Sequence, residues 1–258
     1  MAERESAARS FYTVLLLALV CSALVSGAAV GLRERQEANR RLDQQKNILQ
    51  AAGLYQPGDD IEKKFAAVEP RVVRLADGLL LPPEEMDPAE YDQLRAALQP
   101  GSSRKLSPEE DLAGLGRVEE YAMVYLVREE GKLRKVILPI RGKGLWSTMH
   151  GYLALSADLN SVAGVTFYQH GETPGLGGEI ENPGWQQGWQ GKEIYGSENR
   201  PQLRVSKGPA PEGEERRHRI DGISGATLTM NGVSNLLEFW FGEHGFKPFL
   251  ERYRAGGL

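Results

Sequence analysis

The sequence predicts an α+β protein in which a single N-terminal transmembrane helix precedes a soluble domain with an antiparallel sheet and flanking helices. Three observations support this fold class: residues 10–32 carry no charge, residues 121–172 hold four strand-like runs, and residues 227–241 have apolar side chains at helical spacing. We expect an N-terminal tail over 1–9, the transmembrane helix over 10–32, a helical stalk with the N-terminal part of the soluble region over 33–115, and the α+β domain over 116–258.

The charge-free run 10–32 is about as long as a helix needs to cross ~30 Å of hydrocarbon. A cleaved signal peptide is the alternative, because small residues close the run. The run is longer than such peptides usually need, and a charged segment follows it at once, so we expect an uncleaved anchor. Arginines flank both ends, and the charges alone therefore leave the side of the soluble domain undecided.

Capping residues and chain breakers predict short helices after the anchor. The helix that continues out of the apolar run should end at Gly53. Asp59 and Asp60 can cap a second helix that runs to about Ala67. Asp87 is the expected N-cap of a third helix, with Pro100 as its terminator.

The next segment changes to runs that are typical of antiparallel strands. The sequence REEGK after the first run suits a hairpin turn, and Met123, Tyr125 and Val127 alternate as they would on one face of a sheet. Trp185 and Trp189 are four residues apart, a spacing that favours packing. After residue 227 the apolar spacing predicts an amphipathic helix, whose apolar face is Val233, Leu236, Leu237, Trp240 and Phe241. Gly245 and Pro248 separate this helix from a last short helix.

Composition excludes several classes of function. The formal net charge is -4 and no basic stripe dominates, so nucleic acid is not an expected partner. The single cysteine, Cys21, excludes a disulfide framework or a cysteine-ligated metal within this chain. The four histidines form no pair with i,i+4 spacing, and we therefore expect no metal site.

The stretch SGATLT (224–229) lies between an expected strand end and the amphipathic helix. A helix N-terminus offers unpaired N–H groups to a phosphate, Gly225 permits close approach, and the hydroxyls of Ser224, Thr227 and Thr229 add donors. A helix cap and an ordinary turn are the two alternatives from these residues alone. The stretch lacks the GxxxxGK[ST] pattern of a P-loop.

A second stretch, HGETPGLGGEIENPGW (170–185), leaves the last expected strand as a glycine-rich loop. It could lie against a flat aromatic ligand, although loop glycines often serve only turns. Lys207 in RVSKG is a candidate partner for phosphate or an electron-rich ring, with simple surface exposure as the alternative. Trp146 in GLWS is a candidate contact whose alternative is a place in the core.

Four motifs follow the lone apolar helix in a fixed order: GLWS (144–147), ETPGLGG (172–178), VSKG (205–208) and DGISGATLT (221–229). In this combination the chain resembles, over essentially its whole length, the C subunit of the sodium-translocating NADH:quinone oxidoreductase. In that family and its FMN-binding relatives, the threonine that ends SGAT is esterified to the phosphate of FMN. The resemblance therefore implies an FMN-binding domain with covalent FMN at Thr227.

With FMN as the expected ligand, we predict roles for neighbouring residues. The phosphate should lie near Ser224, Gly225, Ala226 and Thr229. Glu172, Thr173 and Leu176 should border the isoalloxazine ring, with Gly175 and Gly177 keeping the approach open and with Lys207 and Trp146 as further contacts. Asp221 begins the motif that a flavin transferase reads, using FAD as donor; its role is recognition or merely the closing of a turn. Because no serine–histidine pairing is visible in the sequence, we do not expect self-flavinylation.

The implied function is an electron-transfer subunit of a multi-subunit inner-membrane translocase that reduces ubiquinone, with the flavin domain on the periplasmic side. No GxGxxG follows a strand, so the subunit should relay electrons rather than oxidise NADH, and it has no complete active site of its own. The apolar run lacks Asp, Glu, Lys, Arg and His, so sodium movement should belong to other subunits. The alternatives are the G subunit of the related ion-pumping ferredoxin:NAD oxidoreductase and an unmodified membrane-anchored assembly module.

Overall fold

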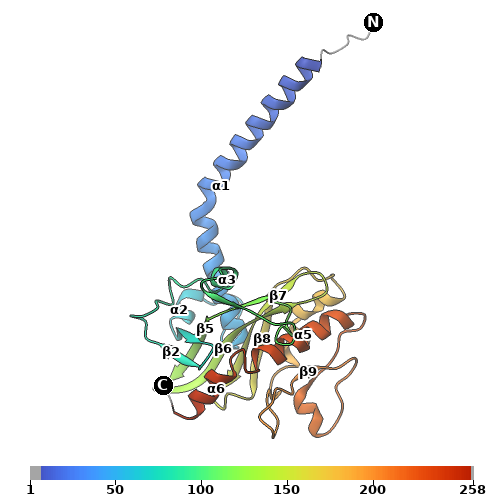
Figure 1. The fold of residues 1–258 in the computed structure, drawn as a ribbon. Helices are drawn as coiled ribbons and strands as arrows, with labels where there is room; N and C mark the ends of the chain where they lie inside the picture. The colour runs from blue at the N-terminus through green and yellow to red at the C-terminus, as the bar shows by residue number, and fades with distance from the viewer. Residues whose placement is uncertain (1–6, 257–258) are drawn as a thin grey trace. The chain divides into compact units, whose positions relative to one another are not determined.

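A long helix opens the chain, and all strands follow it (Figure 1). The computed structural model describes residues 7–256. Helix α1 (Ala7–Ala51) contains the predicted anchor over 10–32 and, among the described residues, is the one helix long and apolar enough to span a membrane. It also takes in the end of the expected tail, whose residues 1–6 lie outside the described part. Two compact units divide the chain, Met1–Gln44 and Gln45–Leu258.

The described part of the first unit, residues 7–44, is helical, and its apolar side chains are exposed over the whole anchor segment. Leu16, Val20 and Leu24 illustrate this, with between about half and two thirds of each side chain accessible. Lipid chains can cover such side chains on a single helix, and the segment therefore fits a single-pass membrane anchor.

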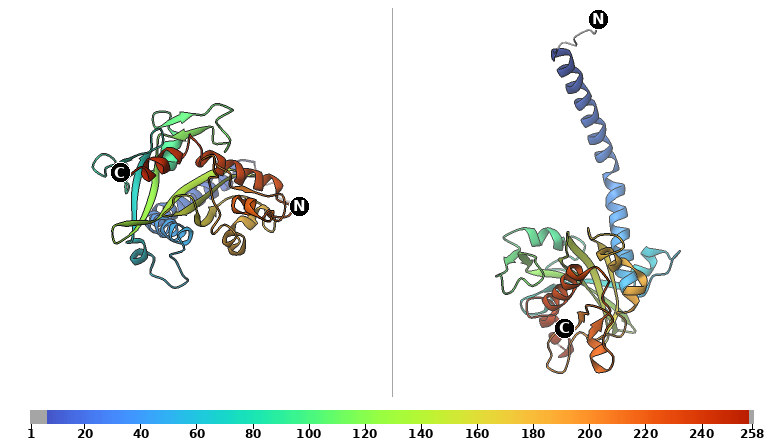
Figure 2. Two further views of the ribbon diagram at one scale, coloured as in Figure 1. Left: turned by 90° about the horizontal axis from the view of Figure 1, so that it is seen from below. Right: turned by 90° about the vertical axis from the view of Figure 1, so that its right-hand side faces the viewer.

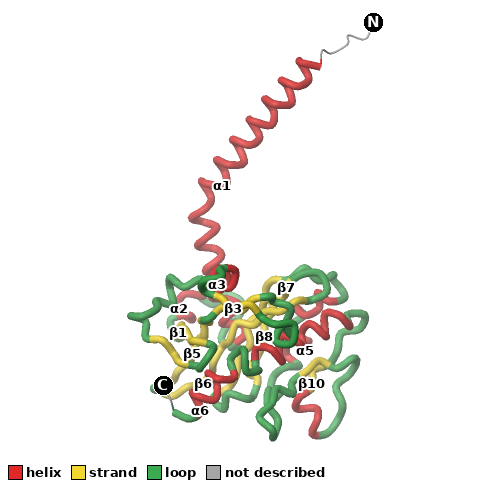
Figure 3. The backbone as a smooth tube through the Cα atoms, in the orientation of Figure 1, coloured by secondary structure: helices red, strands yellow, loops and turns green. Residues whose placement is uncertain are grey.

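The second unit is built on a six-stranded antiparallel sheet with the order β2-β1-β5-β6-β7-β8. Figure 3 shows these strands in yellow, between helices and long loops. The strands are β1 (Val68–Arg74), β2 (Leu79–Leu81), β5 (Tyr121–Glu129), β6 (Lys132–Lys143), β7 (Thr148–Ser156) and β8 (Val162–Gln169). The predicted hairpin joins β5 to β6, and both its central residues, Glu130 and Gly131, have positive φ as such a turn requires.

Smaller elements surround this sheet. The helices are α2 (Ile61–Phe65), α3 (Gln93–Leu98), α4 (Pro183–Gln187), α5 (Thr227–Trp240) and α6 (Lys247–Arg254), with 3₁₀ turns η1 (Gly177–Glu181) and η2 (Glu214–His218). Strands β3 (Ser103–Lys105) and β4 (Arg117–Glu119) form an antiparallel pair, and β9 (Arg204–Val205) and β10 (Arg219–Ile220) a parallel pair.

Both faces of the sheet are buried. The alternation predicted for β5 holds, because Met123, Tyr125 and Val127 point into one cluster while the residues between them point into the other. The first cluster also contains the end of α1, and the second contains α5 and α6. Figure 2 shows the last two helices along the sheet.

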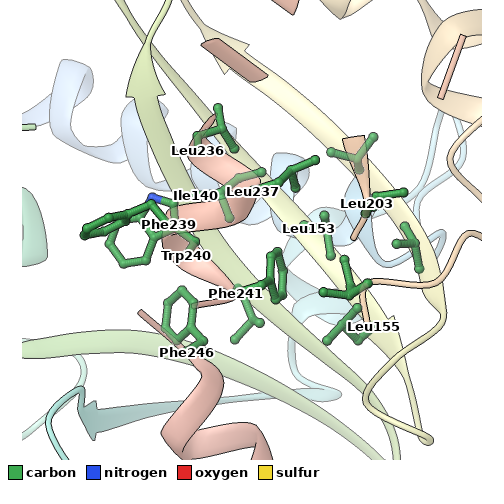
Figure 4. Packing of buried hydrophobic residues seen from close by; sticks show 14 of the residues in the cluster. Ile140, Leu153, Leu155, Leu203, Leu236, Leu237, Phe239, Trp240, Phe241 and Phe246 are labelled. Carbon is green, nitrogen blue, oxygen red and sulfur yellow. The ribbon is translucent and has the colours of Figure 1, made fainter. Parts of the chain in front are cut away.

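The core between α5 and the sheet is rich in aromatic side chains. Trp240, Phe241 and Phe246 are fully buried against Ile140 and Leu153, as Figure 4 shows. The Trp240 indole also donates a hydrogen bond of 2.6 Å to the carbonyl of Arg141 in β6. The apolar face predicted for this helix is therefore the face that fixes its position on the sheet.

Two local predictions for residues 59–100 differ from the structure. Asp60 caps α2 as expected, but the helix ends at Phe65 because Val68 begins β1, which pairs along its whole length with β5. The N-cap of α3 is Asp92, not Asp87, whose carboxylate instead accepts from the N–H of Ala89 within a turn. Residues 33–115 thus supply two strands of the main sheet in addition to the expected helices.

Candidate functional site

Helix α5 begins at Thr227, whose side chain is exposed. The preceding residue, Ala226, occupies the N-cap position, and within the described chain no side chain caps this helix. The capping role that the sequence left open for the SGAT hydroxyls is therefore not seen. The first N–H groups of a 14-residue helix remain available beside an exposed hydroxyl, an arrangement that suits an anionic group.

The two flanking hydroxyls are placed differently. Ser224 is exposed in the turn before the helix, whereas Thr229 is 1% exposed. Thr229 Oγ1 donates a hydrogen bond of 2.5 Å to Glu172 Oε2. Its hydroxyl therefore faces the glycine-rich loop, and the prediction that Thr229 neighbours the phosphate has no support from its contacts.

Glu172 hydrogen-bonds to several segments of this region, and only 5% of the residue is exposed. Besides the Thr229 hydroxyl, its carboxylate accepts from the backbone N–H groups of Leu145, Trp146 and Ser147 at 3.2, 2.9 and 3.4 Å. Burial by itself would raise the pKa of Glu172, but the hydrogen bonds from Thr229 and from the backbone hold that pKa below its usual value. The carboxylate is therefore ionised at neutral pH.

Two glycines allow Glu172 and Thr229 to lie close to the neighbouring main chain. A Cβ added at Gly177 would overlap Thr229 Oγ1, and one added at Gly144 would lie 2.5 Å from Glu172 Oε1. Gly177 therefore serves the packing of the loop against α5, rather than an open approach to a ligand. Gly175 has a φ of +75° in the exposed turn, and a Cβ there would meet open space.

Four exposed apolar side chains belong to the segments that meet at this carboxylate. We call them the apolar rim; they are Leu145, Trp146, Leu176 and Leu228. Trp146 is 68% exposed, so the alternative of a core position is wrong. Leu228 follows Thr227 directly, and the side chain of Leu176 lies against Gly225. Exposed apolar side chains on neighbouring segments are a candidate binding surface.

Thr173 is exposed at the start of the turn that carries Leu176, and its carbonyl accepts from Leu176 and Gly178 at 3.1 and 2.9 Å. Its main chain thus shapes the loop that places Leu176 in the rim. The exposed hydroxyl of Thr173 remains a predicted contact.

The lysine loop, residues 206–210, is attached to the start of the DGISGAT motif. The N–H of Ala210 donates to Asp221 Oδ1 at 2.6 Å, and the N–H of Gly222 donates to the carbonyl of Gly208 at 2.8 Å. Asp221 therefore fastens a neighbouring loop, which agrees with the turn-closing alternative. Lys207 is exposed within that loop.

Sequence reasoning missed Leu145 and Leu228 as members of the rim. Both stand inside motifs that the sequence singled out, but a leucine in a motif gives no signal of exposure. It also assigned Trp185 to packing alone. The Trp185 ring does pack on Trp189, with centroids 5.3 Å apart, and its Nε1 in addition donates to the carbonyl of Asp221 at 2.8 Å.

Comparison with known proteins places these features in one family. Residues 144–242 match the FMN-binding domain family. The chain is 46% identical to the C subunit of the Na(+)-translocating NADH-quinone reductase of Yersinia pestis, over 98% of this chain and 96% of the relative. It is also 46% identical to the C subunit of the same reductase from Pseudomonas aeruginosa, over 99% of both chains.

Solved structures agree with the sequence comparison. The crystal structure of Shewanella oneidensis NqrC matches with a TM-score of 0.77 and 35% identity, over 84% of this chain and 99% of that chain. The crystal structure of the C subunit of the Na(+)-translocating NADH-quinone reductase from Parabacteroides distasonis matches with a TM-score of 0.66 and 27% identity, over 85% and 96%. The matched FMN-binding segment begins at the turn that carries Trp146 and ends just after α5.

Proposed function

The chain belongs to the family of the C subunit of the Na(+)-translocating NADH-quinone reductase, an FMN-binding electron-transfer subunit of a multi-subunit complex, and from this premise we propose that Thr227 carries the FMN through a phosphoester. The observation that carries the proposal is the exposed Thr227 hydroxyl on an uncapped helix N-terminus, next to the apolar rim.

The residues fit both ends of an FMN molecule. The free N–H groups of the first turn of α5 and the exposed Ser224 hydroxyl can receive phosphate oxygens. The rim offers apolar surface to a flat ring, and Lys207 supplies a cation on a loop fastened to the same motif. When bound, FMN supplies the redox chemistry, while the chain contributes attachment, orientation and electrostatics.

A separate flavin transferase makes the bond in this proposal. A threonine hydroxyl is a poor nucleophile without a base, and across residues 7–256 no hydrogen bond joins Thr227 to a histidine or a carboxylate. With FAD as donor, the Thr227 oxygen attacks the phosphorus of the FMN half. The new oxygen–phosphorus bond replaces the pyrophosphate bond, AMP leaves, and a base of the transferase takes the hydroxyl proton.

The exposed position of the site suits a relay. The rim residues are open to a partner surface, so electrons can pass between this flavin and cofactors of other subunits on the path to ubiquinone. The anchor carries no Asp, Glu, Lys, Arg or His over 10–32, and sodium export is therefore assigned to other subunits. The relatives named as the C subunit match over nearly their full length, and they favour this assignment over the ferredoxin-linked G subunit.

Intact-mass analysis tests the attachment. The full chain is produced together with its transferase, as wild type, Thr227→Ala and Ser224→Ala. Wild type and Ser224→Ala should gain the mass of an FMN moiety and give a fluorescent band in a denaturing gel, because both retain the nucleophile. Thr227→Ala should show neither signal. A full adduct in Thr227→Ala would contradict the assigned site, and no adduct in wild type would favour an unmodified assembly module.

We also propose that the unit Gln45–Leu258 lies on the periplasmic side of the bacterial inner membrane, as the family resemblance implies. Protease added to spheroplasts should then degrade this unit while a cytoplasmic marker protein stays intact. Degradation only after the membrane is opened would place the unit in the cytoplasm.

A further inference from the structure

Glu172 stands at the centre of the candidate site, yet its carboxylate is buried and cannot present a broad surface to a ring. All four of its hydrogen-bond partners are donors: one hydroxyl of α5 and three consecutive backbone N–H groups of the turn 144–147. Two of those N–H groups belong to Leu145 and Trp146, which are members of the apolar rim. The carboxylate thus contacts the main chain of two rim residues.

This one carboxylate connects three segments that are far apart in the sequence. The turn 144–147 carries Trp146, the loop 172–177 carries Leu176, and the first turn of α5 carries Thr227. Thr229, the donor on α5, is only two residues from the proposed attachment point. Any displacement of the carboxylate would therefore move rim and attachment point relative to each other.

The Glu172 carboxylate is held in its ionised form as well as in its position. Four donors aimed at its oxygens favour the ionised form, and the low exposure of Glu172 keeps water and salt from screening it. Reduction of a flavin adds negative charge to the ring. A fixed anion beside the turn 144–147 opposes such added charge on a ring that lies against the rim.

We propose that Glu172 is a positioning residue for the flavin, which holds the rim against α5 and whose fixed negative charge lowers the reduction potential of the FMN. The inference rests on the proposed attachment at Thr227. It assigns Glu172 an effect through geometry and charge in place of the direct ring contact expected from the sequence.

The test is a redox titration of the flavinylated full chain in detergent, after intact-mass analysis of each variant. Glu172→Gln removes the charge and should raise the midpoint potential at both low and high salt. The matched control is Glu181→Gln, which removes one negative charge from the same loop, where an exposed carboxylate oxygen lies 3.0 Å from His170 Nε2. Its effect should vanish as salt rises from about 0.01 M to about 1 M, because exposed charges are screened.

A second pair of variants leaves the carboxylate in place. Thr229→Val removes a donor, leaves the anion less neutralised and should lower the midpoint potential, whereas Thr229→Ser keeps the donor and should match wild type. This pair decides the case if Glu172→Gln does not fold.

Several outcomes would overturn the proposal. One is a fully flavinylated Glu172→Gln protein with the wild-type potential. Another is a Glu172→Gln shift that vanishes with salt as the Glu181→Gln shift does. Equal potentials for the two Thr229 variants would also overturn it. A wild-type chain without any FMN adduct would overturn the attachment at Thr227 as well, and intact mass separates that failure from the others.

Discussion

The indole Nε1 of Trp185 donates a hydrogen bond to the carbonyl oxygen of Asp221 at 2.8 Å, across 36 residues of sequence. This bond attaches α4 to the first residue of the DGISGAT motif. The carboxylate of Asp221 also accepts a hydrogen bond from the N–H of Ala210. The first residue of the motif that contains Thr227 is thus held by two hydrogen bonds, one from the Trp185 side chain and one from the lysine loop.

Replacing Trp185 with Phe should destabilise the protein by about 1 kcal/mol, the typical net value of a hydrogen bond. The ring contact with Trp189 is largely kept, so the loss reports the bond to Asp221. Urea unfolding measures the change. The matched control is Trp146→Phe at an exposed position, where the change should stay within about 0.5 kcal/mol. Equal losses for the two variants would show that the bond contributes nothing specific.

The hydrogen-bonded carboxylate of Glu172 predicts a pH dependence of stability. Its pKa lies below the usual 4.5 in the folded protein, so its contribution to stability is present above 4.5 and is lost as pH falls through the lowered value. The stability difference between wild type and Glu172→Gln should therefore be largest near neutral pH and shrink below about pH 4. Urea unfolding of both proteins, near neutral pH and below about pH 4, measures this difference in stability. A difference that does not change with pH would mean that the charge of Glu172 has no part in the stabilisation.

The sequence predicted those elements whose structure depends mainly on their own residues. The run Tyr121–Glu129 is a strand with the predicted alternation, and the apolar spacing after Thr227 is the face of α5 that packs on the sheet. The strand Val68–Arg74 was missed because Pro70 and charged residues interrupt its pattern. It forms because β5 offers a partner along its whole length, and that information is not local.

The candidate site shows the same division. The motifs brought Thr227, Glu172 and Trp146 to attention, and the fold does bring their segments together through the Glu172 carboxylate. Sequence could not tell that Thr229 turns its hydroxyl inward, because that depends on the register between the loop 172–177 and α5. Nor could it show that Leu145 and Leu228 are exposed, since exposure depends on what the rest of the chain covers.

Gly232→Ala should destabilise the protein although alanine is the better helix former. Alanine gains about 1 kcal/mol of helix propensity over glycine. The added Cβ would, however, overlap the carbonyl of Lys143, where α5 crosses the end of β6, and such overpacking costs about 1–3 kcal/mol. Because that carbonyl lies just before the turn 144–147, FMN incorporation should fall too. Thermal unfolding and intact mass measure the two effects.

The matched control for Gly232 is Gly208→Ala in the lysine loop, where a Cβ meets open space and φ is not in the left-handed region. Its stability should change by less than about 0.5 kcal/mol. A Gly232→Ala protein more stable than wild type would show that α5 can move away from β6 without loss.

Truncation should separate the anchor from the folded unit at a position that the buried residues define. A chain that begins at residue 33 lacks the apolar run, so it should stay in the aqueous fraction after ultracentrifugation and fold. It keeps Ile48 and Leu49, which are fully buried against the sheet, and Ala52, whose carbonyl accepts a hydrogen bond from Lys135 Nζ at 2.5 Å. A chain that begins at Leu54 loses these contacts. Burial of each large side chain is worth about 1.5–3 kcal/mol, so the shorter chain should unfold at clearly lower urea. Equal unfolding midpoints would show that the end of α1 contributes nothing to the sheet face that carries Met123, Tyr125 and Val127.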